Sequence, residues 1–203
     1  MGLCDTIGRS CRYFGKYSSR SISNIGCVGA GCFWGTEKYM GGEFLNKFPS
    51  SNIKGEVGYM GPTSAIEFPS YEQVCTGKTG HVEVFRFSFD GGSDMYEKLI
   101  RFFYTFHDPT TLNQQGNDRG TQYASVIYYF DEEQKQLALK VTQALQEILD
   151  GTGNTGYKGG QKVLTDIRKA TTFYPATPDH QEYLKKNPWG YCNHKYYFKW
   201  PEQ

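Results

Sequence analysis

The sequence lacks the features that mark several large classes of protein. No apolar run approaches the roughly 18 residues that a membrane-spanning helix needs, so we expect no transmembrane segment. The formal net charge is only +1, which gives no strong field toward nucleic acid, and we expect no such partner. The six cysteines include no C-x-x-C pair, and no group of cysteines and histidines has the spacing of metal ligands, so we expect no bound metal.

The chain also lacks the marks of a secreted protein. No asparagine is followed two positions later by serine or threonine, so there is no N-glycosylation site. A chain of 203 residues can bury a core without disulfide bonds, and its scattered cysteines need not pair. We therefore expect a cytoplasmic protein whose cysteines are mostly reduced.

What the sequence does contain is a globular composition rich in aromatic side chains. Aromatic residues make up 16% of the chain, with 16 tyrosines and 14 phenylalanines, which supplies ample material for a core. We expect one monomeric catalytic domain over residues 25–203, preceded by a flexible or targeting segment over residues 1–24.

The N-terminal segment supports three interpretations. Gly2 with a hydroxyl side chain at Thr6 fits the N-myristoylation pattern, and Cys4 is placed for a second acyl chain. A mitochondrial presequence is the second interpretation, because Asp5 is the segment's only acid among several basic and hydroxyl residues. The third is an uncleaved, disordered tail.

The spacing of apolar residues predicts the order of the elements. Strands are predicted at 25–30, 52–59, 81–89, 122–130 and 162–168, and helices at 33–48, 95–106 and 132–148. The first six elements follow the split β-α-β order of ferredoxin-like folds. This predicts an α+β sandwich with a mixed or antiparallel sheet. The aromatic tail over residues 187–203 shows no periodicity, so we expect it to be irregular.

Cys32 stands where the first strand ends and the first helix begins. A thiol at a helix N-terminus is near unsatisfied backbone N–H groups, which favour the nucleophilic thiolate. The alternative is an inert buried cysteine, because cysteine is among the most buried residue types. Cys27, on the strand itself, is expected to be buried, and so is Cys75, as a free thiol.

Glu83 is the anomalous residue of the strand at 81–89. Strict alternation places it on the same face as Phe85, Phe87 and Phe89. A carboxyl group in that position would be desolvated, and its raised pKa would make it a neutral acid near pH 7. The alternative is a position at the frayed end of the strand, paired with a lysine.

Several segments, in the same order along the chain, resemble the A class of peptide methionine sulfoxide reductases, which act on methionine S-sulfoxide. Together they run from about residue 26 to residue 192. They are GCFWG at 31–35, YEQVC at 71–75 with TGHVEV at 79–84, HDPT at 107–110, QGNDRGTQY at 115–123, and HQEYL at 180–184 with NPWGYC at 187–192.

The resemblance implies a role for each matching side chain. A sulfoxide sulfur becomes electrophilic only when its oxygen is protonated or strongly hydrogen-bonded, so a nucleophile, an acid and hydroxyl donors must meet. The implied set is Cys32 as nucleophile, Glu83 as acid, Tyr71 and Tyr123 as donors to the oxygen, Asp118 beside that site, Phe33 and Trp34 as walls for the substrate's methyl group, and Cys192 as resolving cysteine.

The resemblance also implies how the enzyme is recycled. Attack would release methionine and leave Cys32 as a sulfenic acid, which Cys192 would convert to a disulfide. Thioredoxin, or dithiothreitol in vitro, would reduce that disulfide, and no bound cofactor is needed. The tail after Cys192 contains no further cysteine, so a single resolving thiol is the simplest scheme. The expected substrates are oxidised proteins and free methionine sulfoxide, and the expected function is repair under oxidative stress.

Two other classes of function compete with this prediction. One is a non-enzymatic, acylated protein that uses an aromatic pocket to bind methyl-bearing ligands. The other is a thiol enzyme that reduces peroxides. The ordered cysteine, glutamate and tyrosine positions favour the reductase over the binding protein.

Overall fold

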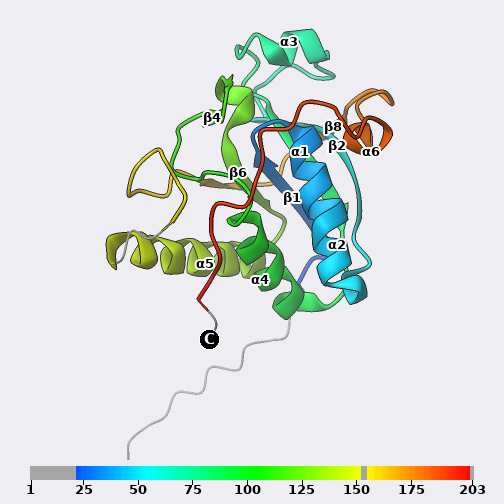
Figure 1. The fold of residues 1–203 in the computed structure, drawn as a ribbon. Helices are drawn as coiled ribbons and strands as arrows, with labels where there is room; N and C mark the ends of the chain where they lie inside the picture. Colours follow the sequence, from blue (N-terminus) through cyan, green and yellow to red (C-terminus); the bar gives the residue numbers. More distant parts are fainter. Residues whose placement is uncertain (1–21, 152–154, 202–203) are drawn as a thin grey trace, which may run out of the picture.

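The computed structural model describes residues 22–151 and 155–201, and the predictions for Gly2 and Cys4 therefore lie outside it. A six-stranded sheet crosses the domain in the order β7-β6-β1-β3-β2-β8 (Figure 1). Its pairs are antiparallel except β6–β7, which is parallel. The strands are β1 (Ile25–Ala30), β2 (Lys54–Met60), β3 (Val82–Ser88), β6 (Ser125–Tyr129), β7 (Asp166–Lys169) and β8 (Phe173–Pro175).

The inner four strands confirm the predicted ferredoxin-like fold. In chain order they are β1, β2, β3 and β6, and in space they lie in the order β6-β1-β3-β2. The parallel strand β7 makes the sheet mixed, as predicted for an α+β sandwich. The helices are α1 (Phe33–Glu37), α2 (Phe44–Lys47), α3 (Tyr71–Cys75), α4 (Gly92–Phe103), α5 (Glu132–Gly151) and α6 (Tyr183–Lys186).

The predicted helix over residues 33–48 is one helical stretch with a changed pitch in its middle. A π-helical segment, Lys38–Glu43, joins α1 to α2, and Pro49 begins a 3-10 turn that ends the stretch. Gly41 lies in the π segment, where a Cβ atom would approach the Phe85 ring to 3.1 Å. The glycine therefore lets this helix pack close to the sheet.

The main core lies between one face of the sheet and the helices. Glu83 shares that face with the buried Phe85 and Phe87 of the same strand and with Phe89 directly after it, as strand alternation predicts. The opposite face carries a smaller apolar cluster around Val84, Val126 and Tyr128. The helical layer and the sheet thus enclose the face from which Glu83 projects.

Three local predictions were wrong. Tyr123 is not on a strand: it ends the 3-10 turn Thr121–Tyr123, and β6 begins only at Ser125. Gly120, with φ of 144°, begins this turn in a conformation that only glycine adopts readily. Cys75 is exposed rather than buried, because it ends the short surface helix α3. The strand predicted at 162–168 is reduced to Asp166–Lys169.

Gln134 joins three elements inside the domain. It lies in α5 with no exposed surface. Its side-chain oxygen accepts the Phe130 N–H at 2.8 Å, at the end of β6. Its amide nitrogen donates to the carbonyl oxygens of Ser23 and Ile25 at 3.1 and 2.7 Å, at the start of β1. One amide therefore satisfies three backbone groups.

We expect Gln134→Ala to lower the free energy of unfolding by about 2–4 kcal/mol, because it leaves these backbone groups without their partner. Urea denaturation would measure the loss. Gln136→Ala is the matched control, since Gln136 lies exposed in the same helix and bonds only the Glu132 side chain. Its effect should stay within about 0.5 kcal/mol, and equal losses in the two variants would contradict the bridging role.

Candidate active site

Cys32 lies at the turn between β1 and α1. Gly31 makes the turn with φ of +90°, and the Gln115 side chain occupies the space that a Cβ atom at residue 31 would need. The Cys32 side chain is half-buried, and the backbone N–H groups of Trp34 and Gly35 lie near enough to its sulfur to favour the thiolate. The start of the helix therefore holds the thiol where the sequence predicted it.

The N–H groups at the helix start favour the thiolate of Cys32, as expected, but burial outweighs them in the free enzyme. Burial raises the pKa of Cys32, and the negative charge of Glu83 raises it further. The Trp34 and Gly35 N–H groups lower the pKa, but by less than burial raises it. Cys32 is therefore a neutral thiol at pH 7, and ionisation has to accompany catalysis.

Glu83 is a buried neutral acid. Its side chain is 1% exposed, which excludes a frayed strand end. Burial raises its pKa to about 8, against a smaller lowering by the Phe33 N–H, which donates to Oε2 at 3.0 Å. The charge of Asp118 raises the pKa further. At pH 7 the group therefore carries the proton that a general acid needs.

Three tyrosine hydroxyls feel the charge of this carboxyl group. Burial raises the pKa of Tyr59 and of Tyr123, and the charge of Glu83 is the next largest cause for both. Burial likewise raises the pKa of Tyr71, whose hydroxyl donates to Cys75, and Glu83 adds to that rise. The structure thus brings both predicted tyrosines within electrostatic reach of Glu83.

Tyr59 is a site residue that sequence reasoning did not identify. It is 3% exposed and lies directly opposite Glu83 in the antiparallel pairing of β2 with β3. The sequence feature that could have identified Tyr59 was its place on the buried face of a predicted strand. Only the register between the two strands shows that its neighbour is the carboxyl group.

Phe33 and Trp34 belong to an aromatic group that includes His180. The Phe33 ring lies 5.8 Å from Tyr59 and 5.3 Å from His180, centroid to centroid. Trp34 stacks on Tyr183 at 3.8 Å and donates from Nε1 to His180 Nδ1 at 3.2 Å. His180 also lies 4.6 Å from the Tyr71 ring. This histidine therefore joins the tryptophan to the tyrosine side of the site.

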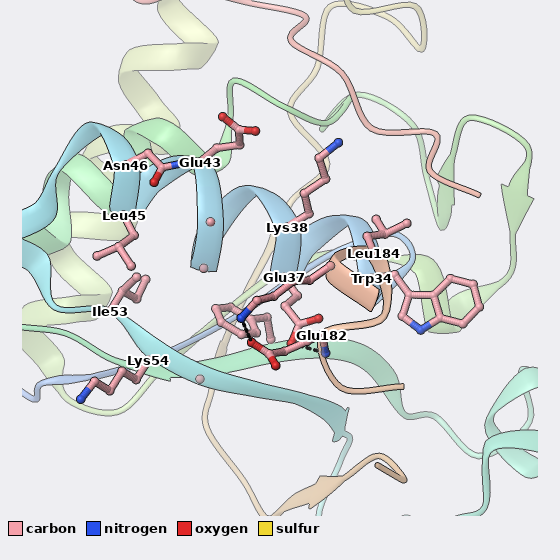
Figure 2. A pocket seen from close by; sticks show the side chains of 15 residues that line it. Trp34, Glu37, Lys38, Glu43, Leu45, Asn46, Ile53, Lys54, Glu182 and Leu184 are labelled. Atoms are coloured by element: carbon pink, nitrogen blue, oxygen red, sulfur yellow. Dashed lines mark hydrogen bonds and ion pairs between the residues drawn. The ribbon is translucent and has the colours of Figure 1, made fainter. Parts of the chain in front are cut away.

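A surface cavity beside the helix after Cys32 adjoins the site without containing it. It has a volume of about 520 Å³ and is lined by parts of the helix after Cys32, of β2 and of α6. Figure 2 shows Trp34 and Leu184 at one end and Ile53, Leu45 and Asn46 toward the other. Cys32 and Glu83 do not line it. Trp34 is the predicted site residue that faces this cavity.

Asp118 binds the chain on both sides of Cys192. Its carboxylate accepts from the Tyr191 hydroxyl at 3.2 Å and from Asn193 Nδ2 at 2.8 Å. Burial raises the pKa of Asp118, and these two donors lower it. The ionised sulfur of Cys32 contributes to a raised pKa of Tyr191, after larger effects of burial and of Asp118. Tyr191 therefore links the Asp118 carboxylate to the neighbourhood of Cys32.

The described cysteines are all free thiols: Cys27, Cys32, Cys75 and Cys192. Cys27 is buried as predicted, with a raised pKa caused by burial. Residues 22–151 and 155–201 contain no group of three or more His, Cys, Asp or Glu side chains that could hold a metal ion. No helix of the described chain is long and apolar enough to cross a membrane.

Comparison with known proteins identifies relatives over nearly the whole described chain. The family described as peptide methionine sulfoxide reductase matches residues 25–201. The chain is 39% identical over 178 residues to a probable peptide methionine sulfoxide reductase of Schizosaccharomyces pombe, covering 87% of this chain and 96% of that protein. It is 44% identical over 166 residues to the peptide methionine sulfoxide reductase MsrA of Acinetobacter baumannii, covering 81% and 85%.

Solved structures agree with the sequence relatives. The reduced form of Mxr1 from Saccharomyces cerevisiae superposes with a TM-score of 0.70 at 34% identity, covering 88% of this chain and 92% of that one. Methionine sulfoxide reductase A of Corynebacterium diphtheriae has a TM-score of 0.64 at 29% identity, covering 83% and 77%. The chain therefore belongs to the peptide methionine sulfoxide reductases, as a member of the MsrA class of oxidoreductases.

Proposed function

We propose that Cys32 and Glu83 carry out the reduction of methionine S-sulfoxide as a nucleophile and acid pair. The Cys32 sulfur attacks the sulfoxide sulfur while Glu83 donates a proton to the sulfoxide oxygen. The oxygen ends on Cys32 as a sulfenic acid, and methionine leaves with its sulfur reduced. The observation that carries this proposal is the neutral carboxyl group of Glu83, buried beside the helix start that holds the thiol.

Charge explains why the two groups suit each other. While both are protonated, Cys32 is a thiol and not the nucleophilic thiolate. Loss of one proton from the pair leaves either a thiolate with a neutral acid or a thiol with a carboxylate, and only the first arrangement can react. The Trp34 and Gly35 N–H groups stabilise the thiolate of that arrangement. Sulfoxide binding would favour it further, because the oxygen accepts the Glu83 proton.

The surrounding side chains would orient the sulfoxide. In this proposal the hydroxyls of Tyr71 and Tyr123 donate to its oxygen, and Asp118 lies beside them. Phe33 and Trp34 hold the methyl group. The charge of Glu83 affects both tyrosine hydroxyls, which supports a common site for the oxygen. Tyr71 has to leave its bond to Cys75 when it donates to substrate.

Recycling requires a second thiol and an external reductant. We assign the second thiol to Cys192, a free cysteine in the segment that binds Asp118. Thioredoxin, or dithiothreitol in vitro, then reduces the disulfide.

We place the enzyme in the cytoplasm as a monomer with one catalytic domain, residues 25–203, acting on oxidised proteins and free methionine sulfoxide. The intact N-terminal mass of the native protein would distinguish an unmodified cytoplasmic enzyme from one that is acylated at Gly2 or has lost a presequence.

We expect Cys192→Ser to complete about one turnover per enzyme when thioredoxin is the reductant, because Cys32 remains a sulfenic acid. Chromatographic counting of methionine per enzyme measures this stoichiometry. Cys32→Ser should form no methionine at all. Sustained turnover of Cys192→Ser with thioredoxin would remove Cys192 from the resolving step.

We expect Glu83→Gln to slow the first turnover by roughly two to four orders of magnitude. Glutamine keeps an oxygen to accept the Phe33 N–H, and it keeps a donor, but it has no proton to transfer. Rapid quenching after mixing with a methyl sulfoxide, without reductant, would give the rate. An unchanged rate would show that Glu83 is not the acid.

The raised pKa of Glu83 also predicts a pH-dependent cost in stability. The folded protein keeps this proton up to about pH 8, whereas the unfolded chain loses it near the ordinary value of 4.5. Unfolding therefore releases a proton between these values, and stability falls as the pH rises through that window. Glutamine cannot titrate. We expect the stability of Glu83→Gln relative to the wild type to rise by several kcal/mol between about pH 5 and pH 8, because each pKa unit is worth about 1.4 kcal/mol.

Urea denaturation of both proteins at several pH values would measure this difference. Its growth should stop above about pH 8, where the folded wild type also loses the proton. A difference in stability that does not change with pH would mean that Glu83 is already ionised in the folded protein at pH 7.

A further inference from the structure

The C-terminal tail, residues 187–201, follows α6 and passes the start of α1 on its way to the C-terminus (Figure 1). It contains no helix or strand of its own. Backbone hydrogen bonds hold its later part, from the Lys195 N–H to the Phe106 carbonyl oxygen at 3.3 Å and from the Tyr197 N–H to the Thr105 carbonyl oxygen at 2.9 Å. Nearer to Cys192, contacts made by side chains hold the tail. Two of those side chains, Tyr191 and Asn193, flank Cys192 directly.

Both flanking side chains bind the same carboxylate. Tyr191 donates its hydroxyl to Asp118 Oδ1 at 3.2 Å, and Asn193 Nδ2 donates to Oδ2 at 2.8 Å. The same Nδ2 lies 2.5 Å from the Gln115 carbonyl oxygen and 3.1 Å from the Tyr191 hydroxyl oxygen. The two side chains and Asp118 thus form a closed group of hydrogen bonds on both sides of Cys192, which we call the tail clamp.

The next residue continues the attachment. His194 Nε2 donates to the Ala30 carbonyl oxygen at 2.6 Å, and the Tyr39 hydroxyl donates to the His194 carbonyl oxygen at 3.3 Å. Burial lowers the pKa of His194 to about 4, so the ring is neutral. Ala30 is the last residue of β1, two before Cys32. The tail is therefore fixed to the strand that leads to the nucleophile.

Two glycines make room for this close approach. A Cβ atom at Gly35, in the first turn of the helix after Cys32, would collide with the His194 ring. A Cβ atom at Gly116 would lie 3.0 Å from the Asn193 Cβ atom, and the φ of +58° at Gly116 also favours glycine. The chain on both sides of the tail is thus shaped to receive residues 193 and 194.

We propose that Tyr191 and Asn193 are positioning residues that hold Cys192 near the helix start that carries Cys32, by binding Asp118. This inference rests on the proposed resolving role of Cys192. In that step the Cys192 thiol attacks the sulfur of the Cys32 sulfenic acid, a disulfide forms and water leaves, so no outside oxidant or reductant is needed. A tail held near the nucleophile raises the effective concentration of the second thiol.

The clamp acts on the resolving step rather than on the attack on substrate. Its readout is therefore the rate of disulfide formation relative to the rate of methionine formation. A variant that only disturbs folding would slow both steps together. Loss of the clamp should lower the ratio of the two rates.

The test compares Asn193→Ala, Tyr191→Phe and the double variant with the wild type. Each enzyme is mixed with one equivalent of a methyl sulfoxide without reductant. Samples are quenched with a 1,3-dicarbonyl reagent that traps sulfenic acid, and intact mass spectrometry counts trapped enzyme against disulfide. Tyr196→Phe is the matched control, because it removes a hydroxyl from the same tail at a residue that is 58% exposed and does not contact Asp118.

In the double variant we expect the rate ratio to fall by at least about tenfold, with trapped sulfenic acid on Cys32, because two hydrogen bonds to a charged group are lost. Each single variant should give a smaller fall, and Tyr196→Phe should match the wild type. A double variant that resolves as fast as Tyr196→Phe would overturn the inference.

Cys192→Ser in the same assay separates this inference from the proposed function. If Cys192→Ser accumulates sulfenic acid and the double variant does not, only the positioning role fails. If Cys192→Ser forms a disulfide as fast as the wild type, the resolving role fails, and the inference fails with it.

Discussion

The burial of one carboxyl group is the constraint on which the rest of the site depends. Glu83 lies on the aromatic face of β3, where ionisation would cost more free energy than the single Phe33 N–H returns. The fold therefore keeps a proton at this position at neutral pH. The same lack of water that makes Glu83 an acid also keeps Cys32 protonated. In the proposed mechanism the two groups act together, because the substrate takes the proton of Glu83 and is attacked by the sulfur of Cys32.

Sequence reasoning identified the parts of this site that follow from periodicity. Alternation placed Glu83 among phenylalanines, and the strand-to-helix pattern placed Cys32 at a helix start. The net pKa shift of Cys32 could not be predicted, because helix-start N–H groups are a local effect, whereas burial depends on every element packed around the thiol. Tyr59 was missed for a related reason. Its proximity to Glu83 follows from the register between two strands, which neither strand specifies alone.

The fold, like the site, was predictable where apolar residues recur with a regular period. The order of elements was sufficient to predict the inner four strands. Of the outer strands, β7 was predicted to begin at residue 162 instead of Asp166, and β8 was not predicted, because both stretches show little alternation. Tyr123 fits the apolar alternation of the predicted strand, but it lies in a 3-10 turn that begins after Gly120. The tail was correctly expected to be irregular, yet its position depends on hydrogen bonds to Asp118 and Ala30 that have no sequence period.

The short outer strands have a consequence for an enzyme that repairs damaged proteins. The exposed backbone of a partly unfolded chain can pair with any open sheet edge. Here one edge of the main sheet is the four-residue strand β7, and the other is the three-residue strand β8, which ends at Pro175. Proline has no N–H to donate, and such short strands give an incoming chain little to pair with. The edges of the main sheet thus offer a partly unfolded chain little template for β-sheet association.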